Sequence, residues 1–557
     1  MIRSLASCLA HAFALCAFIL LGFADAARAQ EQQTAEQKKP EQGKAAEQPV
    51  QQFDVWEYQL EGNTLLSRVT IEKALYPYLG PGKSIDIVQQ AADNLERIYR
   101  DSGYPAIFVD IPPQDVVGGV VKLKVTEGKI GRVTVRGARY FTPSGIREKL
   151  PALESGRPVA VADVQNDIRN LNGLTPDLKV APVLKPGKEP GQVDVELKVK
   201  DEFPLHGDVE YNNFNSADTT RGRVRTSFSY DNLWQQAHSF GLTYQTSPEN
   251  TSEVRVLSAS YAMPIDENYR LSAFAVQSKT SVETAVDASV GGNSLSVLGN
   301  GEVAGLRLIH PLIGTQNYSH STVLGADYKH FTEDVSGSEI GIRYMTFSAQ
   351  YGGTIVGSSS LTSMTVNATL GIRGVVNNGS EFAAKRAGAK AGFLLLNGGI
   401  SRTDTLPDDW QAVSRLRWQL TDSPLINNEQ FSVGGFSSVR GYYESQALGD
   451  RGYSATAELR TPSLDQWFMH QFDDTPLQRV GLNEVRVLAF IDWGQVFVIN
   501  ALPEQADRST LSGAGVGLHL RALNHLRALW DFSYPLRDAG TIKQGDLRTN
   551  FQMVYDF

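Results

Sequence analysis

The chain has 557 residues, of which 52 are basic and 61 acidic, giving a formal net charge of −9. Because there is no basic surplus, the sequence lacks the electrostatic signature of a nucleic-acid-binding protein. A mean hydropathy of −0.24 excludes a bundle of transmembrane helices, each of which needs about 20 consecutive apolar residues. A transmembrane β-barrel remains compatible with these values, because its strands alternate between lipid-facing and lumen-facing residues.

Residues 1–29 are predicted to be a secretory signal peptide. An apolar segment over 10–23 is followed by Ala27-Arg28-Ala29, which matches the small-x-small pattern of a cleavage site. Both cysteines of the chain, Cys8 and Cys16, lie inside this segment. We therefore expect a mature protein without cysteine.

Two alternatives concern the same N-terminal segment. Its apolar part could be retained as an anchor, and Leu5-Ala6-Ser7-Cys8 resembles a lipoprotein cleavage box, although it precedes the apolar core where such a box would follow it. The next segment, 30–52, consists mostly of Gln, Glu, Lys, Ala and Pro and has almost nothing to bury. We expect it to be a flexible tether or a plug segment.

Two similar units follow, over residues 53–128 and 129–202. Their first strands align at 58–62 and 133–137, a spacing of about 75 residues, and later apolar positions repeat within one residue of that period. Each unit is predicted to run strand, helix, helix, strand, strand, because its apolar residues change from helical spacing to alternation. The repeat predicts two small α+β domains.

In the first unit, the predicted helices cover residues 69–79 and 87–101. Ser67 and Asp86 stand where side chains of these types commonly cap the first turn of a helix. We predict them to be the two N-caps.

The segment from 203 to 557 is predicted to be an outer-membrane β-barrel. Apolar and polar residues alternate in one stretch after another, and no helical pattern is available to cover a face of the sheet. At about 22 residues per strand and connection, the segment holds about sixteen strands. Such a sheet must close on itself to pair its edges inside a membrane.

The last strand carries a distinct signal. Phe551, Met553, Tyr555 and Phe557 alternate on one face and end in a terminal phenylalanine, opposite a polar face. This pattern resembles the C-terminal signal of bacterial outer-membrane barrels, by which the barrel assembly machinery recognises its clients. The resemblance implies that these four residues direct assembly into the outer membrane.

Two motifs indicate the family. Val439-Arg440-Gly441-Tyr442 lies in the loop after a strand over 414–420, and Phe490-x-Asp492-x-Gly494 follows about fifty residues later. Together with the two preceding α+β units, they resemble the TpsB transporters of two-partner secretion, also called the haemolysin secretion/activation family. The resemblance implies two polypeptide-transport-associated (POTRA) domains in the periplasm, preceding a 16-stranded transmembrane barrel in a mainly β protein.

The same resemblance implies a gate inside the barrel. The loop around 421–452 would fold back into the lumen, where Arg440 would pair with Asp492, supported by Gly441, Tyr442 and Gly494. Alternation along the strand that contains Asp492 independently points this carboxylate into the lumen. Three glycines on one face of a later strand would leave room for the loop, namely Gly513, Gly515 and Gly517.

Other arginines are predicted to face the lumen and to line a water-filled wall. They are Arg223, Arg225, Arg415, Arg417 and Arg527.

The resemblance implies a pore that binds an unfolded exoprotein through its POTRA domains and secretes it without ATP. The client would be of the adhesin, haemolysin or contact-dependent toxin type. An insertase that assembles other barrels is the main alternative, and a passive porin is a further one. We expect no enzyme, cofactor or metal, since the nine histidines show no metal-ligand spacing and no nucleophile motif is present.

Overall fold

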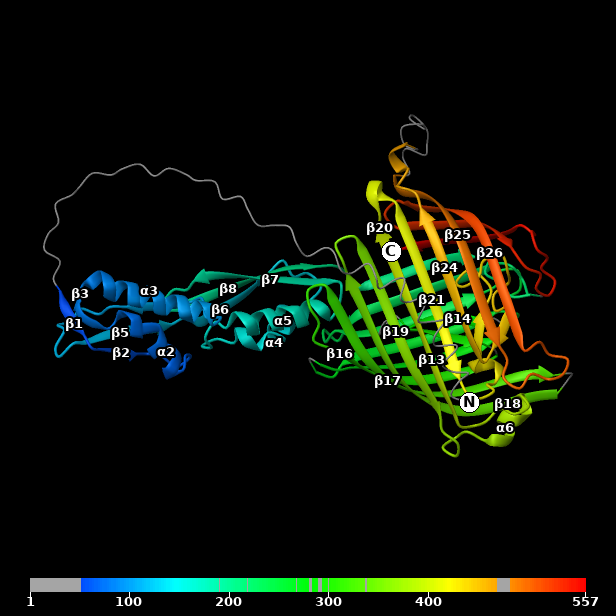
Figure 1. The fold of residues 1–557 in the computed structure, drawn as a ribbon, viewed down its shortest axis with the longest axis horizontal. Coiled ribbons are helices and arrows are strands. Elements are labelled where there is room, and N and C mark those ends of the chain that lie inside the picture. The colour runs from blue at the N-terminus through cyan, green and yellow to red at the C-terminus, as the bar shows by residue number, and fades with distance from the viewer. Residues whose placement is uncertain are drawn as a thin grey trace.

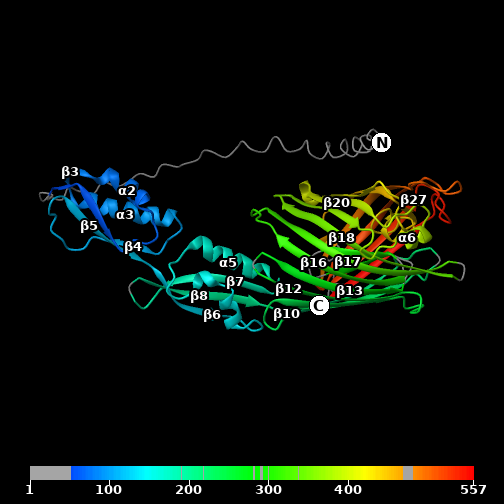
Figure 2. The same ribbon diagram turned by 90° about the horizontal axis from the view of Figure 1, so that it is seen from below.

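The computed structural model describes residues 52–557 apart from positions 190, 218, 267, 280–282, 289–292, 299, 336–337 and 468–480. The predicted signal peptide and the tether or plug segment therefore lie outside the described residues, except for Gln52. Two α+β units extend from one end of a barrel (Figure 1, Figure 2). Among the described residues, no helix is both long and apolar enough to cross a membrane.

The first unit has a three-stranded sheet in the order β2-β5-β4, with β2 parallel and β4 antiparallel to the central strand. Its elements are β2 (Glu57–Glu61), α2 (Arg68–Leu75), α3 (Ile85–Asp101), β4 (Ile107–Asp110) and β5 (Val120–Glu127). This is the predicted element order. An additional two-stranded sheet, which was not predicted, pairs β1 (Phe53–Val55) with β3 (Gly80–Lys83).

The helix starts of the first unit differ from the prediction at one position. Ser67 caps α2 as expected, because its side chain accepts a hydrogen bond from the Thr70 amide. The prediction for Asp86 is wrong, since Ser84 is the N-cap of α3 and Asp86 lies in its first turn. A carboxylate in the first turn still stabilises the helix, because it faces the positive end of the helix dipole.

The second unit repeats this arrangement, with a sheet in the order β6-β8-β7 and again one parallel and one antiparallel pair. Its elements are β6 (Lys129–Arg136), α4 (Pro143–Glu148), the 3₁₀ helix η2 (Pro151–Leu153), α5 (Val161–Gly173), β7 (Leu178–Pro186) and β8 (Gln192–Asp201).

Two glycines show how closely the units repeat each other. Gly62 and Gly137 follow the first strands of the two sheets and have φ angles of +91° and +97°. A Cβ atom on Gly62 would lie 2.3 Å from the carbonyl oxygen of Val125, and one on Gly137 would lie 2.2 Å from that of Val199. Both the positive φ and the close backbone approach require glycine, so the sequence repeat at these positions is a structural one.

The barrel consists of sixteen strands, and each pairs with its neighbours in an antiparallel, closed ring, as predicted. Closure is made by β28, the last strand, which pairs with β9, the first. The strands are β9 (Leu205–Asn212), β10 (Arg223–Leu233), β11 (His238–Thr246), β12 (Arg255–Pro264), β13 (Arg270–Lys279), β16 (Asn300–Pro311), β17 (Tyr318–Val335), β18 (Ser338–Val356), β19 (Ser360–Gly371), β20 (Phe393–Thr405), β21 (Gln411–Thr421), β24 (Arg451–Arg460), β25 (Leu482–Phe497), β26 (Arg508–Ala522), β27 (Leu526–Pro535) and β28 (Arg548–Asp556).

Between β13 and β16 a separate hairpin pairs β14 (Glu283–Ala288) with β15 (Asn293–Leu298), and the 3₁₀ helix η3 (Pro407–Asp409) precedes β21.

The barrel wall alternates as the sequence predicts. On β25, Ile491 is 55% exposed on the outer face, whereas the next residue, Asp492, is 1% exposed in the lumen. Other strands also place large apolar side chains on the exposed outer surface, among them Leu257, Leu306, Leu324, Leu394, Val516 and Trp530. An apolar outer belt around a polar interior is the arrangement that a lipid bilayer requires.

One part of the lumen is apolar, which the sequence analysis did not predict. The short helix α6 (Gly379–Lys385), in the connection between β19 and β20, buries Phe382 in this region. Phe382 packs into a cluster with apolar side chains of the wall and of the loop after β21, including Phe274, Tyr344, Phe393, Leu425 and Ile426. Since α6 follows the end of β19 far from the α+β units, this cluster fills the lumen toward that far end.

Candidate functional site

The loop between β21 and β24 folds into the lumen; we call it the in-folded loop (421–452). It contains the 3₁₀ helix η4 (Asn427–Glu429) and a small hairpin of β22 (Phe431–Val433) and β23 (Ala447–Gly449). Between these strands the chain turns through a tip whose apolar side chains are buried. They form a cluster with residues of β25, β26 and the loop after β27, comprising Phe431, Val433, Val439, Tyr442, Val496, Leu511 and Ile542.

Arg440, at the tip of the in-folded loop, lies among three carboxylates. Its Nε donates to Asp492 Oδ2 at 2.8 Å and its Nη2 to Asp492 Oδ1 at 3.1 Å, which is a bidentate pair. Its Nη1 donates to Glu458 Oε2 and to Asp531 Oδ2, each at 3.1 Å. The guanidinium also lies over the Phe490 ring, 3.3 Å from its centroid. Four hydrogen bonds from this buried guanidinium therefore go to carboxylates of the barrel wall.

The backbone of the tip is fixed to the same wall position. The amide of Arg440 donates to Asp492 Oδ2 at 3.0 Å, so one carboxylate holds both the side chain and the main chain. Glu458 is shared with a second cation, Arg460, whose Nε donates to it at 2.6 Å. Breaking such a buried network by removing one charge costs roughly 3–5 kcal/mol, because the remaining charges stay desolvated and unpaired.

Sequence reasoning proposed the pair of Arg440 and Asp492, and the structure brings these two side chains together. It did not include Glu458 or Asp531. Glu458 lies on β24 and Asp531 on β27, and each is on the polar face of its strand, which lines the lumen. A search for acidic residues on the lumenal faces of the predicted strands would have found both. Their distance from Arg440 depends on strand register, which the local pattern does not contain.

The glycines of the two motifs bring the loop and the wall into close contact. A Cβ atom on Gly494 would lie 2.9 Å from Cγ2 of Val439, and one on Gly441 would lie 2.9 Å from the Pro535 nitrogen. Gly441 also has a φ of +97°, a region that favours glycine. Tyr442 is buried next to it, and its hydroxyl lies 2.9 Å from the carbonyl oxygen of Ser512.

Of the three glycines expected to make room for the loop, only Gly513 does so. A Cβ atom there would lie 2.0 Å from the carbonyl oxygen of Arg440. Gly515 instead faces the Phe532 carbonyl oxygen and the Phe490 ring, and Gly517 faces the Asp531 carboxylate. These two glycines therefore make room for the partners of Arg440 rather than for the loop backbone.

We predict that Gly513→Ala weakens docking of the in-folded loop. The new methyl group meets a backbone oxygen, which cannot rotate away, and overpacking of this kind costs roughly 1–3 kcal/mol. Limited proteolysis of the protein in outer-membrane vesicles should show new cleavage within the loop. Gly352→Ala on β18 is the matched control, because its nearest neighbour would be 3.8 Å away. Equal protection of the loop in both variants would contradict the prediction.

A further buried carboxylate, Asp450, fixes the base of the in-folded loop and was not predicted. It is fully buried and forms a bidentate pair with Arg386 from the connection after α6, with an Nη2 to Oδ2 distance of 2.9 Å. It also accepts from the amides of Leu425 at 2.8 Å and Ile499 at 2.6 Å. Asp450 therefore joins three loops at the far end of the barrel.

The loop is also attached to the opposite wall. Glu429 of η4 accepts from Lys329 Nζ on β17 and from the Tyr344 hydroxyl on β18, each at 2.6 Å. Arg440 contacts β24, β25 and β27, so the loop spans the lumen between the two halves of the wall.

A cavity of about 270 Å³ remains beside the loop tip. Its lining is rich in hydroxyl groups and includes two predicted lumenal arginines, with Ser363, Thr365, Arg415, Arg417, Ser437 and Thr456 among the residues. Ser437 belongs to the loop and the others to wall strands, so the cavity is the space between loop and wall.

The other predicted lumenal arginines lie at different heights of the wall. Arg223 is buried and donates to the Thr220 carbonyl at 2.7 Å, while Arg225 pairs with Glu210 at 2.8 Å. Arg527 is 54% exposed and lies 3.5 Å from Asp556.

The predicted C-terminal signal residues lie on the outer face of the closing strand. Met553, Tyr555 and Phe557 are exposed, and Phe551 is half-buried. The amide of Phe557 donates a hydrogen bond to the Gly207 carbonyl oxygen at 2.9 Å, and the amide of Gly207 donates one to the Phe557 carbonyl oxygen at 3.0 Å. The last residue of the chain thus completes the pairing that closes the barrel.

Comparison with known families gives two matches. The family described as haemolysin secretion/activation protein ShlB/FhaC/HecB matches residues 191–520, more than half of the chain. A POTRA domain of the ShlB type matches residues 53–128.

Among individual proteins, the outer membrane transporter CdiB of Dickeya dadantii is 23% identical over 87% of this chain and 83% of its own length. The heme/hemopexin transporter protein HuxB of Haemophilus influenzae is 24% identical over 69% of this chain and 67% of its own length. The solved structure of CdiB from Escherichia coli has a TM-score of 0.64 at 20% identity and 93% coverage of both chains. BamA from Haemophilus ducreyi shares the fold, with a TM-score of 0.52 at 14% identity over 91% of this chain and all of that one.

Proposed function

Because the chain belongs to the haemolysin secretion/activation family, whose members are outer-membrane transporters of two-partner secretion, we propose that it secretes one unfolded exoprotein without ATP. The barrel lies in the outer membrane and the POTRA domains lie in the periplasm. The end of the barrel that carries them is therefore periplasmic, and the loops joined by Asp450 are at the cell surface. The observation that carries the proposal is the in-folded loop fixed to the wall through Arg440.

The POTRA domains would capture the client. Each has a three-stranded sheet with two edge strands, β2 and β4 or β6 and β7, which pair on one side only within the domain. An extended polypeptide can add a strand to such an edge, or place an apolar face in the groove between helix and sheet. We propose capture by one of these modes, with a client of the adhesin, haemolysin or contact-dependent toxin type.

The in-folded loop would act as the gate. Its tip occupies the lumen, and its polar contacts with the wall are individually reversible, so a client entering from the periplasm could displace it. The periplasm offers no nucleotide, and folding of the client at the cell surface would give the movement its direction. This mechanism contains no catalytic step.

We predict that deleting the gene removes one large exported protein from the culture medium and cell surface. The measurement is mass spectrometry of both fractions, with the deletion strain complemented by the wild-type chain. Because the proposed pore serves a single client, other outer-membrane barrels should remain at normal abundance. A general loss of barrels would instead support the insertase alternative, which the shared fold of BamA keeps relevant. Unchanged secretion would refute the proposal.

A further inference from the structure

The joint between the second POTRA domain and the barrel is built from side chains of both parts. Gln235, in the turn between β10 and β11, accepts from the Thr142 amide and donates to the Tyr140 carbonyl, each at 3.0 Å. Arg270 at the start of β13 donates to the Leu174 carbonyl at 2.8 Å. The POTRA domain is therefore seated against the periplasmic mouth of the barrel.

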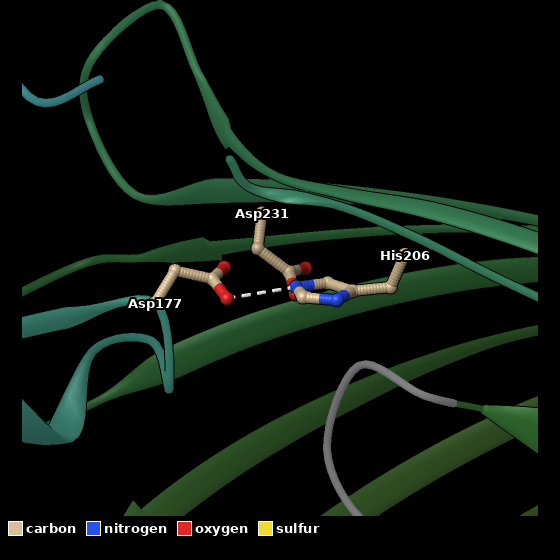
Figure 3. Close-up of side chains that lie close together, drawn as sticks. All are labelled: Asp177, His206 and Asp231. Carbon is tan, nitrogen blue, oxygen red and sulfur yellow. Dashed lines mark ion pairs between the residues drawn. The ribbon is translucent and has the colours of Figure 1, made fainter. Parts of the chain in front are cut away.

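Three potential metal ligands meet in this joint (Figure 3). Asp177 comes from the loop between α5 and β7 of the POTRA domain, His206 from β9 and Asp231 from β10. One ligand atom from each residue lies within 4.8 Å of the other two. The imidazole Nε2 is 2.8 Å from Asp177 Oδ1 and 3.9 Å from Asp231 Oδ2.

These distances suit a shared metal ion. Two ligands of a tetrahedral zinc ion, each about 2.0–2.1 Å from the metal, are roughly 3.3–3.4 Å apart. The two separations from His206 Nε2 lie on either side of that value, so shifts of about half an ångström would bring each of these pairs to the spacing of zinc ligands. The two carboxylate oxygens lie within 4.8 Å of each other. The carboxylates carry two negative charges, which balance a divalent cation when the imidazole is neutral.

An ordinary ion pair does not account for the orientation of the imidazole. His206 Nε2 is buried, yet it makes no hydrogen bond with any residue in the described part of the chain, although Asp177 Oδ1 is close enough to accept one. A protonated imidazole in this position would normally direct its N–H at the carboxylate. A neutral imidazole nitrogen is the commonest metal ligand in proteins, and this Nε2 lies within 4 Å of a carboxylate oxygen of both Asp177 and Asp231 without a hydrogen bond to either.

Asp177 is already held in position for such a role. It is buried, and its second oxygen, Oδ2, accepts from the Thr175 hydroxyl at 2.9 Å. This leaves Oδ1 facing His206. Carboxylates that bind metals are commonly oriented in this way by a second hydrogen-bonding partner.

We propose that Asp177, His206 and Asp231 bind a divalent transition-metal ion of the zinc class, which joins the second POTRA domain to the barrel. One imidazole nitrogen and two carboxylate oxygens are ligands that zinc accepts, with water in the fourth position. The ion would restrain the angle between the capture domain and the pore. This site goes beyond the secretion function and does not depend on the identity of the client.

The test uses the full-length protein in detergent, stripped of metal with a chelator and then titrated with Zn²⁺ or Co²⁺. We expect one ion per chain and, for Co²⁺, the intense visible absorption of a four-coordinate site. His206→Gln and Asp231→Asn should each weaken binding by about 100-fold or more, since each removes a ligand of a three-ligand site. His525→Ala is the matched control, because this exposed histidine lies in another periplasmic turn.

Heat-modifiable mobility of each variant on a gel would show that the barrel remains folded. The proposal is overturned if the folded wild-type protein binds less than one metal ion per chain. That result is expected if the three residues form only an ion pair. It is also overturned if the folded His206→Gln and Asp231→Asn variants bind as tightly as the control. Since the readout is metal bound to purified protein, a negative result would leave the secretion proposal standing.

Discussion

Replacing Arg440 with alanine is expected to lower secretion of the exoprotein by about tenfold or more, while the barrel still reaches the outer membrane. The change removes the cation that three buried carboxylates share, Asp492, Glu458 and Asp531. Leaving buried charges unpaired costs roughly 3–5 kcal/mol, which is enough to release the loop tip from the wall. The measurement is the ratio of client in the medium to client in the periplasm.

Two control variants show whether the effect depends on this particular arginine and on more than its positive charge. Arg527→Ala removes a predicted lumenal arginine that is half-exposed and weakly paired, so secretion should change little. Arg440→Lys keeps the charge but loses the bidentate pair, and we expect an intermediate loss. Asp492→Ala should reproduce the Arg440→Ala defect, and combining the two changes should add little because both break one network. Normal secretion by both single variants would remove the role we assign to the gate.

The second large effect concerns assembly of the barrel. Replacing Phe557 with alanine should reduce the amount of folded barrel in the outer membrane by roughly tenfold, since a closed barrel leaves no unpaired strand edge in the bilayer. Phe557 directly follows β28, the strand that closes the barrel, and its aromatic ring covers Gly207, where a Cβ atom would lie 2.5 Å away. The same residue is the last of the signal that the assembly machinery is expected to recognise. Heat-modifiable mobility of outer-membrane fractions measures the effect.

Tyr534→Ala is the matched control for Phe557, because Tyr534 is also an exposed aromatic residue on the outer face, one strand away. It should leave assembly nearly unchanged. If the Phe557 variant folds as well as the wild type, its proposed role in assembly is wrong. If both variants fail equally, the effect comes from loss of outer apolar surface and not from the closing strand.

Much of the architecture could be predicted because it depends on local patterns. The length of the segment predicted about sixteen strands, and alternation placed Asp492 in the lumen. The spacing of apolar residues predicted the element order of each α+β unit, and the repeat of about 75 residues predicted that there are two. The prediction failed where the outcome depends on contacts between distant segments. The helix containing Phe382 is too short for a periodic signal, and it is stabilised by wall residues remote in sequence.

The same limit applies to the site. The motif residues around Arg440 could be identified, but Glu458, Asp531 and Asp450 acquire their roles only through strand register and loop packing. The histidines show no metal-ligand spacing along the sequence because His206 meets its two partners across different elements. Spacing rules detect ligands on one helix or loop, and they miss ligands that a domain joint brings together.

The in-folded loop has one further consequence, which concerns the mechanics of the wall. Through Glu429 it is bonded to β17 and β18, and through Arg440 to β24, β25 and β27. The loop therefore connects two separate parts of the barrel wall across the lumen and restrains the distance between them. In the proposed mechanism the tip leaves during transport, and the wall then loses the contacts that Arg440 makes with β24, β25 and β27, so that the cross-section of the barrel can change shape more easily. We therefore expect the resting barrel to be stiff and the conducting barrel to be compliant, so that the moving client itself helps to set the width of the passage.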